Sequence, residues 1–154
     1  MNHPATDQAA TPLRMLPMRL HHHAYTTDDH ETTRHFYERI LGLPLAAFEV
    51  ERERRDNGWV DLGYAFYELG DGSTLAFFTF DDPKKQSVWK ARAQSLFVHI
   101  SLLVDGATQD EIEERLIKAG HEPFVLRHGF CTSLYVKDPN GLNLELVGAA
   151  DPNL

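Results

Sequence analysis

The stretch LHHHAYTTDD, residues 20–29, has a counterpart further along the chain in FVHISLLV at 97–104. A β-strand points successive side chains to opposite faces, so one histidine of each stretch faces away from its neighbours: His22 in the first and His99 in the second. A helical pattern follows each strand and ends at a glycine. The chain therefore reads as an internal repeat, and this repeat decides the fold.

Each half of the chain reads as a strand, a helix and three further strands. For the first half we expect a helix from near Asp28 to Gly42 and strands at 18–26, 45–50, 59–69 and 73–80. For the second half we expect a helix from near Thr108 to Gly120 and strands at 96–104, 121–127, 131–137 and 142–148. The turn signals GDG at 70–72 and DPNG at 138–141 join the last two strands of each half. The pattern predicts an α+β fold of two similar modules.

The boundaries follow from the same pattern. Residues 1–17 contain three prolines among scattered polar residues and are expected to form a flexible N-terminal arm. The remainder is expected to be a single domain, residues 18–150, made of module one at 18–80, a linker at 81–95 and module two at 96–150. The charged segment ERERRDNG at 51–58 is interpreted as a solvated hairpin loop, with a lid over the site as the alternative.

Composition excludes several classes of function. The formal net charge of −8 argues against a general nucleic-acid binder, which needs a basic face for phosphates. A single cysteine, Cys131, forms no disulfide within the chain and fits a reducing cytoplasm. Residues 1–17 lack the apolar run of a secretory signal, and no run approaches the ~20 apolar residues of a membrane helix. We therefore expect a cytoplasmic protein with a small-molecule partner, bound neither to nucleic acid nor to a membrane.

Three side chains on the repeated strands are candidate metal ligands. Glu145 lies between Leu144 and Leu146 on the last strand, where a carboxylate is costly unless it is paired or binds a metal. With His22 and His99 it makes a set of two imidazoles and one carboxylate, which suits Fe(II) and also Mn(II) or Zn(II). A lone strand histidine is more often structural, and periodicity alone does not bring these three residues together.

A family resemblance makes this set specific. The segments LHHHAYTTDD and HFYERILGLPL within 20–45, FVHISLLV at 97–104 and YVKDPNGLNLELV at 135–147 resemble the vicinal oxygen chelate superfamily. That superfamily includes glyoxalase I, extradiol dioxygenases, fosfomycin-resistance enzymes and bleomycin-resistance proteins. The resemblance implies two βαβββ modules with curved mixed sheets around a central metal-binding cleft, with His22, His99 and Glu145 as the metal ligands.

One position separates the branches of the superfamily. Glyoxalase-like members usually carry a fourth ligand on the last strand of the first module. When Gly72 is aligned with Gly141, Ala76 falls opposite Glu145, and alanine is not a ligand. The three-ligand pattern resembles extradiol dioxygenases or fosfomycin-resistance enzymes. Aromatic residues on the strands expected to line the cleft favour a flat or apolar substrate: Phe66, Phe78, Phe80, Phe97 and Tyr135.

The resemblance therefore favours an extradiol-type dioxygenase that acts on a catechol-like substrate with Fe(II); Mn(II), Zn(II) and Ni(II) are the alternative metals. Tyr135 resembles the tyrosine of extradiol enzymes that hydrogen-bonds a substrate oxygen, and His128 is a candidate acid or base. The chain departs from ring-cleaving members because no histidine lies between His35 and His99, where they carry an acid–base histidine.

Two other functions stay open. The first is a glyoxalase-like isomerase, lyase or transferase in which the metal acts only as a Lewis acid. The second, less favoured because the ligand set is intact, is a protein that sequesters a ligand without catalysis. Exposed strand edges also predict a homodimer. The sequence leaves open whether the ligands come from one chain or from two.

Overall fold

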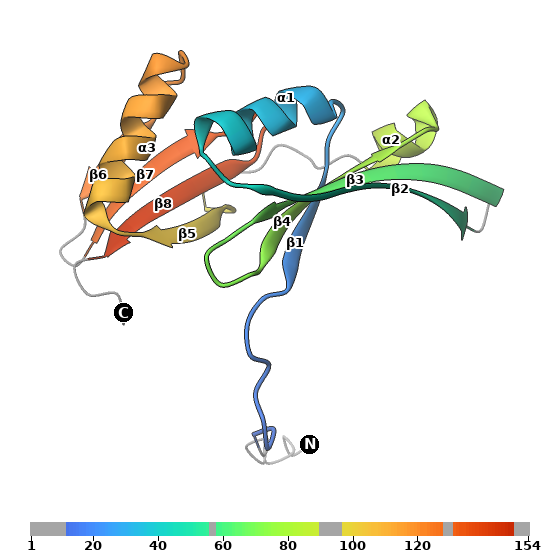
Figure 1. Cartoon of the computed structure of the whole chain (residues 1–154), viewed down its shortest axis with the longest axis horizontal. Helices are drawn as coiled ribbons and strands as arrows, with labels where there is room; N and C mark the ends of the chain where they lie inside the picture. Colours follow the sequence, from blue (N-terminus) through green and yellow to red (C-terminus); the bar gives the residue numbers. More distant parts are fainter. Residues whose placement is uncertain (1–11, 56–57, 90–96, 128–130, 150–154) are drawn as a thin grey trace, which may run out of the picture.

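The computed structural model describes most of the chain, namely residues 12–55, 58–89, 97–127 and 131–149. It forms two four-stranded sheets, with the strand orders β1-β4-β3-β2 and β5-β8-β7-β6 (Figure 1). The first sheet consists of β1 (His22–Thr26), β2 (Leu45–Arg55), β3 (Gly58–Glu68) and β4 (Thr74–Phe80). The second consists of β5 (Ile100–Val104), β6 (Phe124–Arg127), β7 (Cys131–Lys137) and β8 (Asn143–Ala149). In each sheet one pair is parallel, β1 with β4 or β5 with β8, and the others are antiparallel. The predicted α+β fold of two modules is confirmed.

Both predicted helices are present, with shifted starts. The first comprises α1 (His30–Arg34) and the π-helical segment η1 (His35–Ile40), and the second is α3 (Gly106–Lys118). Aspartates fix both starts: Asp29 accepts a hydrogen bond from the backbone N–H of Glu31 at 2.9 Å, and Asp105 accepts one from that of Thr108 at 2.7 Å. The predicted start near Thr108 was therefore late, because Asp105 satisfies the free N–H groups one turn earlier. A third, short helix, α2 (Pro83–Trp89), follows β4.

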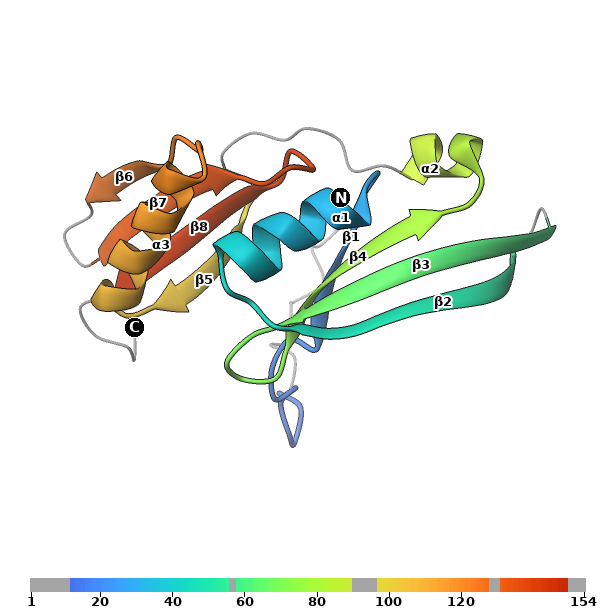
Figure 2. The same ribbon diagram turned by 45° about the horizontal axis from the view of Figure 1, so that its top comes forward.

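The helices cover one face of the sheets. Figure 2 shows α1 and α3 on the same side of the two sheets. One continuous apolar core lies beneath them and draws on both modules: its largest fully buried members include Tyr37, Tyr67, Phe36, Phe77, Leu75, Leu116 and Leu134. The opposite faces of the sheets, which we call the open faces, carry the alternate side chains of each strand. The candidate ligands lie on these open faces.

Buried and half-buried hydrogen bonds join the modules at the DPNG turn. The Tyr37 hydroxyl on the first helix donates to Asp138 Oδ2 at 2.7 Å, and both side chains are buried. Asn140 of the same turn donates to the hydroxyl of Thr33 at 3.1 Å and accepts from that of Thr27 at 2.7 Å. Burial raises the pKa of Asp138 above its ordinary value. The turn predicted from DPNG thus also docks module two on module one.

The segment predicted as a hairpin loop at 51–58 is instead largely strand, and this corrects the prediction. β2 and β3 pair from Leu45 to Arg55, and only residues 56–57 between them lie outside the described residues. Charged side chains are compatible with this hairpin because they pair on its exposed surface. Arg52 lies 3.4 Å from Asp61 Oδ1 and 6.0 Å from the centre of the Trp59 ring.

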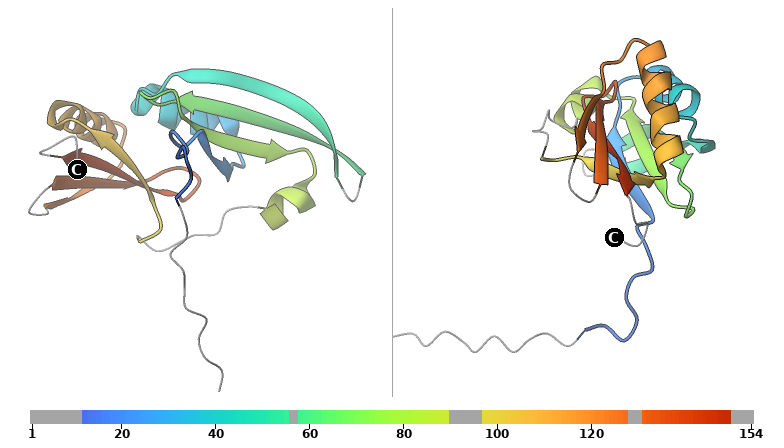
Figure 3. Two further views of the ribbon diagram at one scale, coloured as in Figure 1. Left: turned by 90° about the horizontal axis from the view of Figure 1, so that it is seen from below. Right: turned by 90° about the vertical axis from the view of Figure 1, so that its left-hand side faces the viewer.

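The chain before β1 contacts the first module near the start of the strand, where the His21 carbonyl oxygen accepts from the Thr74 N–H at 3.1 Å and Arg19 lies beside Asp71 and Gly72. The strand expected from residue 18 begins only at His22, and the arm from residue 12 onward runs away from both sheets (Figure 3). Within the described residues no helix combines the length and the apolar character needed to cross a membrane.

His30 gives a stability prediction. Its Nε2 lies 3.2 Å from the Gly63 carbonyl oxygen and 3.1 Å from Thr79 Oγ1, whereas its buried Nδ1 has no partner among the described residues. Protonation would place an unpaired N–H at Nδ1, and burial lowers the pKa of the imidazole. The neutral form is favoured in the folded state, so stability is retained above about pH 6.5 and lost as pH falls below it, where the unfolded chain takes up a proton.

We expect the His30→Gln variant, which keeps a donor toward Gly63, to lose less stability than the wild type below about pH 6.5. Urea unfolding measured across this range tests the expectation. His35→Gln, at an exposed position on the same helix, is the matched control. The expectation would be contradicted if the free energy of unfolding fell equally with pH in the wild type and in His30→Gln.

Candidate metal centre

Three of the predicted site residues meet on the open face of the second sheet. His99, just before β5, places its Nε2 2.9 Å from Glu145 Oε2 on β8. Tyr135 on β7 donates its hydroxyl to the other oxygen, Glu145 Oε1, at 2.9 Å. The strand register explains the meeting, because Tyr135 pairs directly with Glu145 and Ser101 pairs with it from the other side. An imidazole, a carboxylate and a phenol therefore converge at one point.

The carboxylate is buried and held in its charged form. Burial raises the pKa of Glu145, but hydrogen bonds from Ser133, Ser101 and Tyr135, together with nearby His99, outweigh it and lower the pKa below its usual value. Burial, followed by the hydrogen bond to Glu145, raises the pKa of the Tyr135 hydroxyl. Near neutral pH the site thus presents an anionic acceptor beside a protonated phenol.

The first sheet carries the same arrangement without its carboxylate. The rings of His22 and Phe66 lie edge to face with centres 6.0 Å apart, and those of His99 and Tyr135 repeat this geometry at 5.8 Å. Ala76 pairs with Phe66 as Glu145 pairs with Tyr135. The predicted equivalence of Ala76 and Glu145 is therefore confirmed by the register. Ala76 is fully buried and supplies no ligand atom.

His22 is not joined to the other two candidate ligands within the chain. Its side chain is exposed, and its Nδ1 lies 2.9 Å from His21 Nδ1. Across residues 12–55, 58–89, 97–127 and 131–149, no group of three or more His, Cys, Asp or Glu side chains is placed to hold a metal ion. His23 stacks on Tyr25 toward the helices. His128 lies outside the described residues.

Among the aromatic residues predicted to line a cleft, Phe66, Phe78 and Tyr135 lie on the open faces of the sheets. Phe66 and Phe78 lie on the open face of the first sheet, where their ring centres are 6.4 Å apart. Phe97, expected to line the cleft, is 94% exposed. The sequence reading missed Phe124, whose ring stacks on Tyr135 at 5.1 Å, because β6 has no alternation that marks its open face. Phe124 places an aromatic wall beside the hydroxyl of Tyr135.

The donor set fits part of a metal site. His99 Nε2 and both carboxylate oxygens of Glu145 are ligand atoms for Fe(II), Mn(II) and Zn(II), and they already point at one another. Tyr135 fixes the orientation of the carboxylate in the way that outer partners of metal ligands do. These two residues supply two ligands, and a tight site requires at least one more.

Comparison with known proteins identifies the family of the chain. The model of the glyoxalase/bleomycin resistance protein/dioxygenase superfamily matches residues 19–146, which span both modules and the His99, Tyr135 and Glu145 site. The chain belongs to this superfamily. A search of curated proteins gave no significant match.

Solved structures share the fold of this superfamily member at low identity. A glyoxylase/bleomycin resistance protein/dioxygenase domain from Frankia sp. EAN1pec is 21% identical, with a TM-score of 0.65 over 87% of this chain and 99% of that one. The oxidase ChaP-H2 is 19% identical, with a TM-score of 0.59 over 89% and 98%. The fosfomycin resistance protein FosX from Mesorhizobium loti is 20% identical, with a TM-score of 0.58 over 85% and 91%. This range of activities on one fold leaves the reaction to be argued from the site.

Proposed function

We propose that the protein is a metal-dependent dioxygenase of the extradiol type that acts on a catechol-like substrate with vicinal oxygens. The observation that carries the proposal is the convergence of His99 and Tyr135 on the two oxygens of Glu145, each at 2.9 Å. Fe(II) is the metal that two histidines and one carboxylate suit best among those that leave positions open for substrate and oxygen. Such a metal provides the route by which electrons pass from substrate to oxygen.

The protein's own residues supply position and proton control. The Tyr135 hydroxyl keeps its proton near neutral pH, so it is a hydrogen-bond donor for a substrate oxygen beside Glu145. Phe124 stacks on Tyr135 and offers an apolar face to a flat ring. The open faces of both sheets are thus suited to an aromatic substrate: the first contributes Phe66 and Phe78.

The third ligand in this proposal is His22 of a second copy of the chain. His22 is exposed on the open face of the first sheet, and within the described residues no third ligand joins His99 and Glu145. The equivalent ring geometry at His22 and His99 shows that both modules present a histidine beside an aromatic ring on the open face. In a twofold dimer, module one of each copy would meet module two of the other in two identical contacts. A homodimer with two such sites satisfies every ligand.

Oxygen uptake tests the reaction. We expect protein loaded anaerobically with Fe(II) to consume about one O₂ per catechol cleaved, with a yellow ring-opened product, and to lose this activity when the metal is chelated. Catalysis of a glyoxalase-like isomerisation without oxygen uptake would replace the dioxygenase by the Lewis-acid alternative. Ligand binding without turnover, with or without metal, would instead support a protein that sequesters its ligand without catalysis.

A further inference from the structure

The strand that follows His99 has a free edge. Within the described part of the chain β5 pairs only with β8, so the backbone groups on its other edge have no strand partner. Edge strands of this kind are templates on which another extended segment can add. Proteins usually protect such an edge by covering it with a helix or by placing charged side chains on it. The five residues of β5 carry no charged side chain, and no described helix lies along their free edge.

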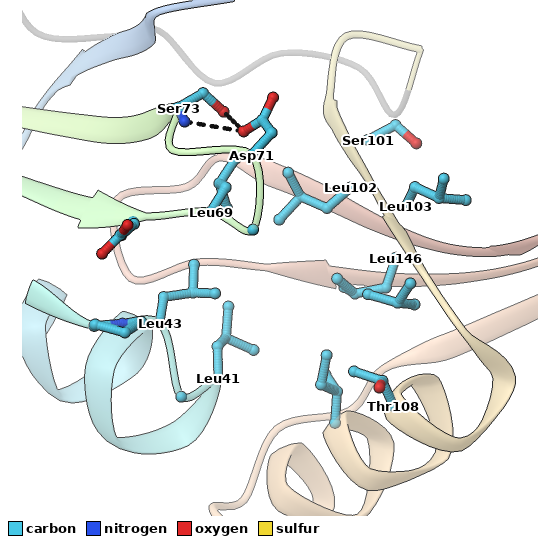
Figure 4. A pocket seen from close by; sticks show the side chains of 16 residues that line it. Leu41, Leu43, Leu69, Asp71, Ser73, Ser101, Leu102, Leu103, Thr108 and Leu146 are labelled. Carbon is cyan, nitrogen blue, oxygen red and sulfur yellow. Dashed lines mark hydrogen bonds between the residues drawn. The ribbon is translucent and has the colours of Figure 1, made fainter. Parts of the chain in front are cut away.

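A groove of ≈ 790 Å³ lies along this edge, between the two modules (Figure 4). Its floor is apolar and is built by leucines and an isoleucine from both modules: Leu41, Leu43, Leu69, Leu102, Leu146 and Ile112. The side chain of Leu103, on β5, is 56% exposed at the groove. Two acidic residues, Glu68 at the end of β3 and Asp71 in the β3–β4 connection, lie along its rim. The groove therefore suits an apolar segment that carries positive charge.

The N-terminal arm has this character. Its segment LRMLPMRL at 13–20 exposes five large apolar side chains, Leu13, Met15, Leu16, Met18 and Leu20, each by 67–90%. In an extended chain the residues at 16, 18 and 20 share one face, and Arg14 and Arg19 supply two positive charges. Pro17 lacks an N–H, which an added edge strand tolerates because alternate N–H groups face solvent. Exposure of this many apolar side chains to solvent is unfavourable.

We propose that the arm at 13–20 of one copy adds to the free edge of β5 in a second copy and fills the groove between its modules. The proposal rests on the composite metal site, and it names the contact that joins the copies. The arm leads directly into β1, which carries His22, and β5 directly follows His99. When His22 of one copy reaches His99 of the other, residues 13–20 lie within about 30 Å of the site at ~3.3 Å per residue.

Charge and polarity favour the arm at 13–20 as the segment that fills the groove. Arg14 complements Glu68 and Asp71 at the rim, whereas Arg19 lies beside Asp71 and Gly72 of its own chain. The aliphatic side chains of the arm match the leucines of the floor. Exchange in both directions gives two identical contacts, as a twofold dimer requires. The arm thereby becomes a dimer contact next to the site.

Disulfide trapping tests the contact. In a Cys131→Ser background, cysteines are introduced at Leu103 and, one at a time, at Leu16, Met18 or Leu20, and the protein is oxidised mildly. A disulfide requires Cα atoms about 4.4–6.8 Å apart, so at least one pair is expected to yield mostly covalent dimer on a non-reducing gel. The matched control pairs each arm cysteine with Ile117→Cys, which is 58% exposed on α3 and does not line the groove.

Three results would overturn the proposal: no trapped dimer with Leu103→Cys, equal trapping with Ile117→Cys, or a disulfide formed within one chain. A second measurement avoids reliance on cysteines. Leu16→Asp with Met18→Asp should weaken the dimer at least about tenfold in sedimentation, because two apolar contacts become charged, whereas Val88→Asp, also highly exposed, should not.

Failure of the arm contact and failure of the composite site are separable. If the arm is trapped on Leu103 but metal affinity does not change in His22→Ala, the arm contact holds and the composite site is refuted. If His22→Ala abolishes metal binding but no arm cysteine is trapped, the composite site holds and the arm contact is refuted.

Discussion

Replacing His99 by alanine is expected to lower metal affinity by more than about a hundredfold and to abolish oxygen uptake. The imidazole supplies one of the two ligand groups that the chain itself brings together, 2.9 Å from Glu145 Oε2. Loss of a partner that only orients a ligand costs about 10–100-fold in affinity, and loss of a ligand itself costs more. Calorimetric titration of the apoprotein with Fe(II) or Zn(II) measures the change in metal affinity.

The control for this variant is His35→Ala, which removes an exposed histidine of η1 that does not lie on the second sheet. Its metal affinity should match the wild type. Circular dichroism and thermal unfolding distinguish loss of the ligand from loss of the fold. A His99→Ala protein that is folded and binds metal as tightly as the wild type would rule out His99 as a ligand.

Replacing Tyr135 by phenylalanine is expected to lower kcat by about 10²–10³-fold while the bound metal is retained. The ring of phenylalanine keeps the stacking on Phe124 and the edge contact with His99, so only the hydroxyl is lost. That hydroxyl donates to Glu145 Oε1 and is the group placed to hold a proton beside the substrate. The expected signature is therefore a fall in kcat with metal content unchanged.

Tyr25→Phe is the matched control, because its hydroxyl lies 3.3 Å from His23 Nε2 on the helix-facing side of β1. It should leave kcat within about twofold of the wild type. Loss of metal together with activity in Tyr135→Phe would assign the hydroxyl to positioning of Glu145. Unchanged turnover would remove Tyr135 from the reaction.

The repeat made much of the site predictable. Strand alternation placed His22 and Glu145 on the open faces, and alignment of the two halves identified Ala76 as the counterpart of Glu145, which the strand register bears out. These features depend on side-chain direction within one strand and on equivalence between modules. Both are encoded by short patterns of apolar and polar residues.

Contacts between elements were not predictable in the same way. The DPNG turn reads as a turn, but nothing in its pattern shows that Asp138 receives a buried hydrogen bond from Tyr37. Arg52 lies in a segment whose charge indicated a loop, and its cross-strand pairing with Asp61 makes that segment part of a hairpin. The separation of His22 from His99 depends on how two modules pack, and periodicity within a strand carries no information about it.

The central claim is that His99 and Glu145 of one chain share a metal with His22 of another. It is tested most directly by co-expressing the His22→Ala and His99→Ala variants with different tags and purifying the mixed dimer. One of its two sites would then have all three ligands intact, so we expect about one metal ion per mixed dimer, whereas each variant alone binds none at the same free metal concentration. A mixed dimer that binds no metal would contradict the claim, because ligands drawn from a single chain leave both of its sites incomplete.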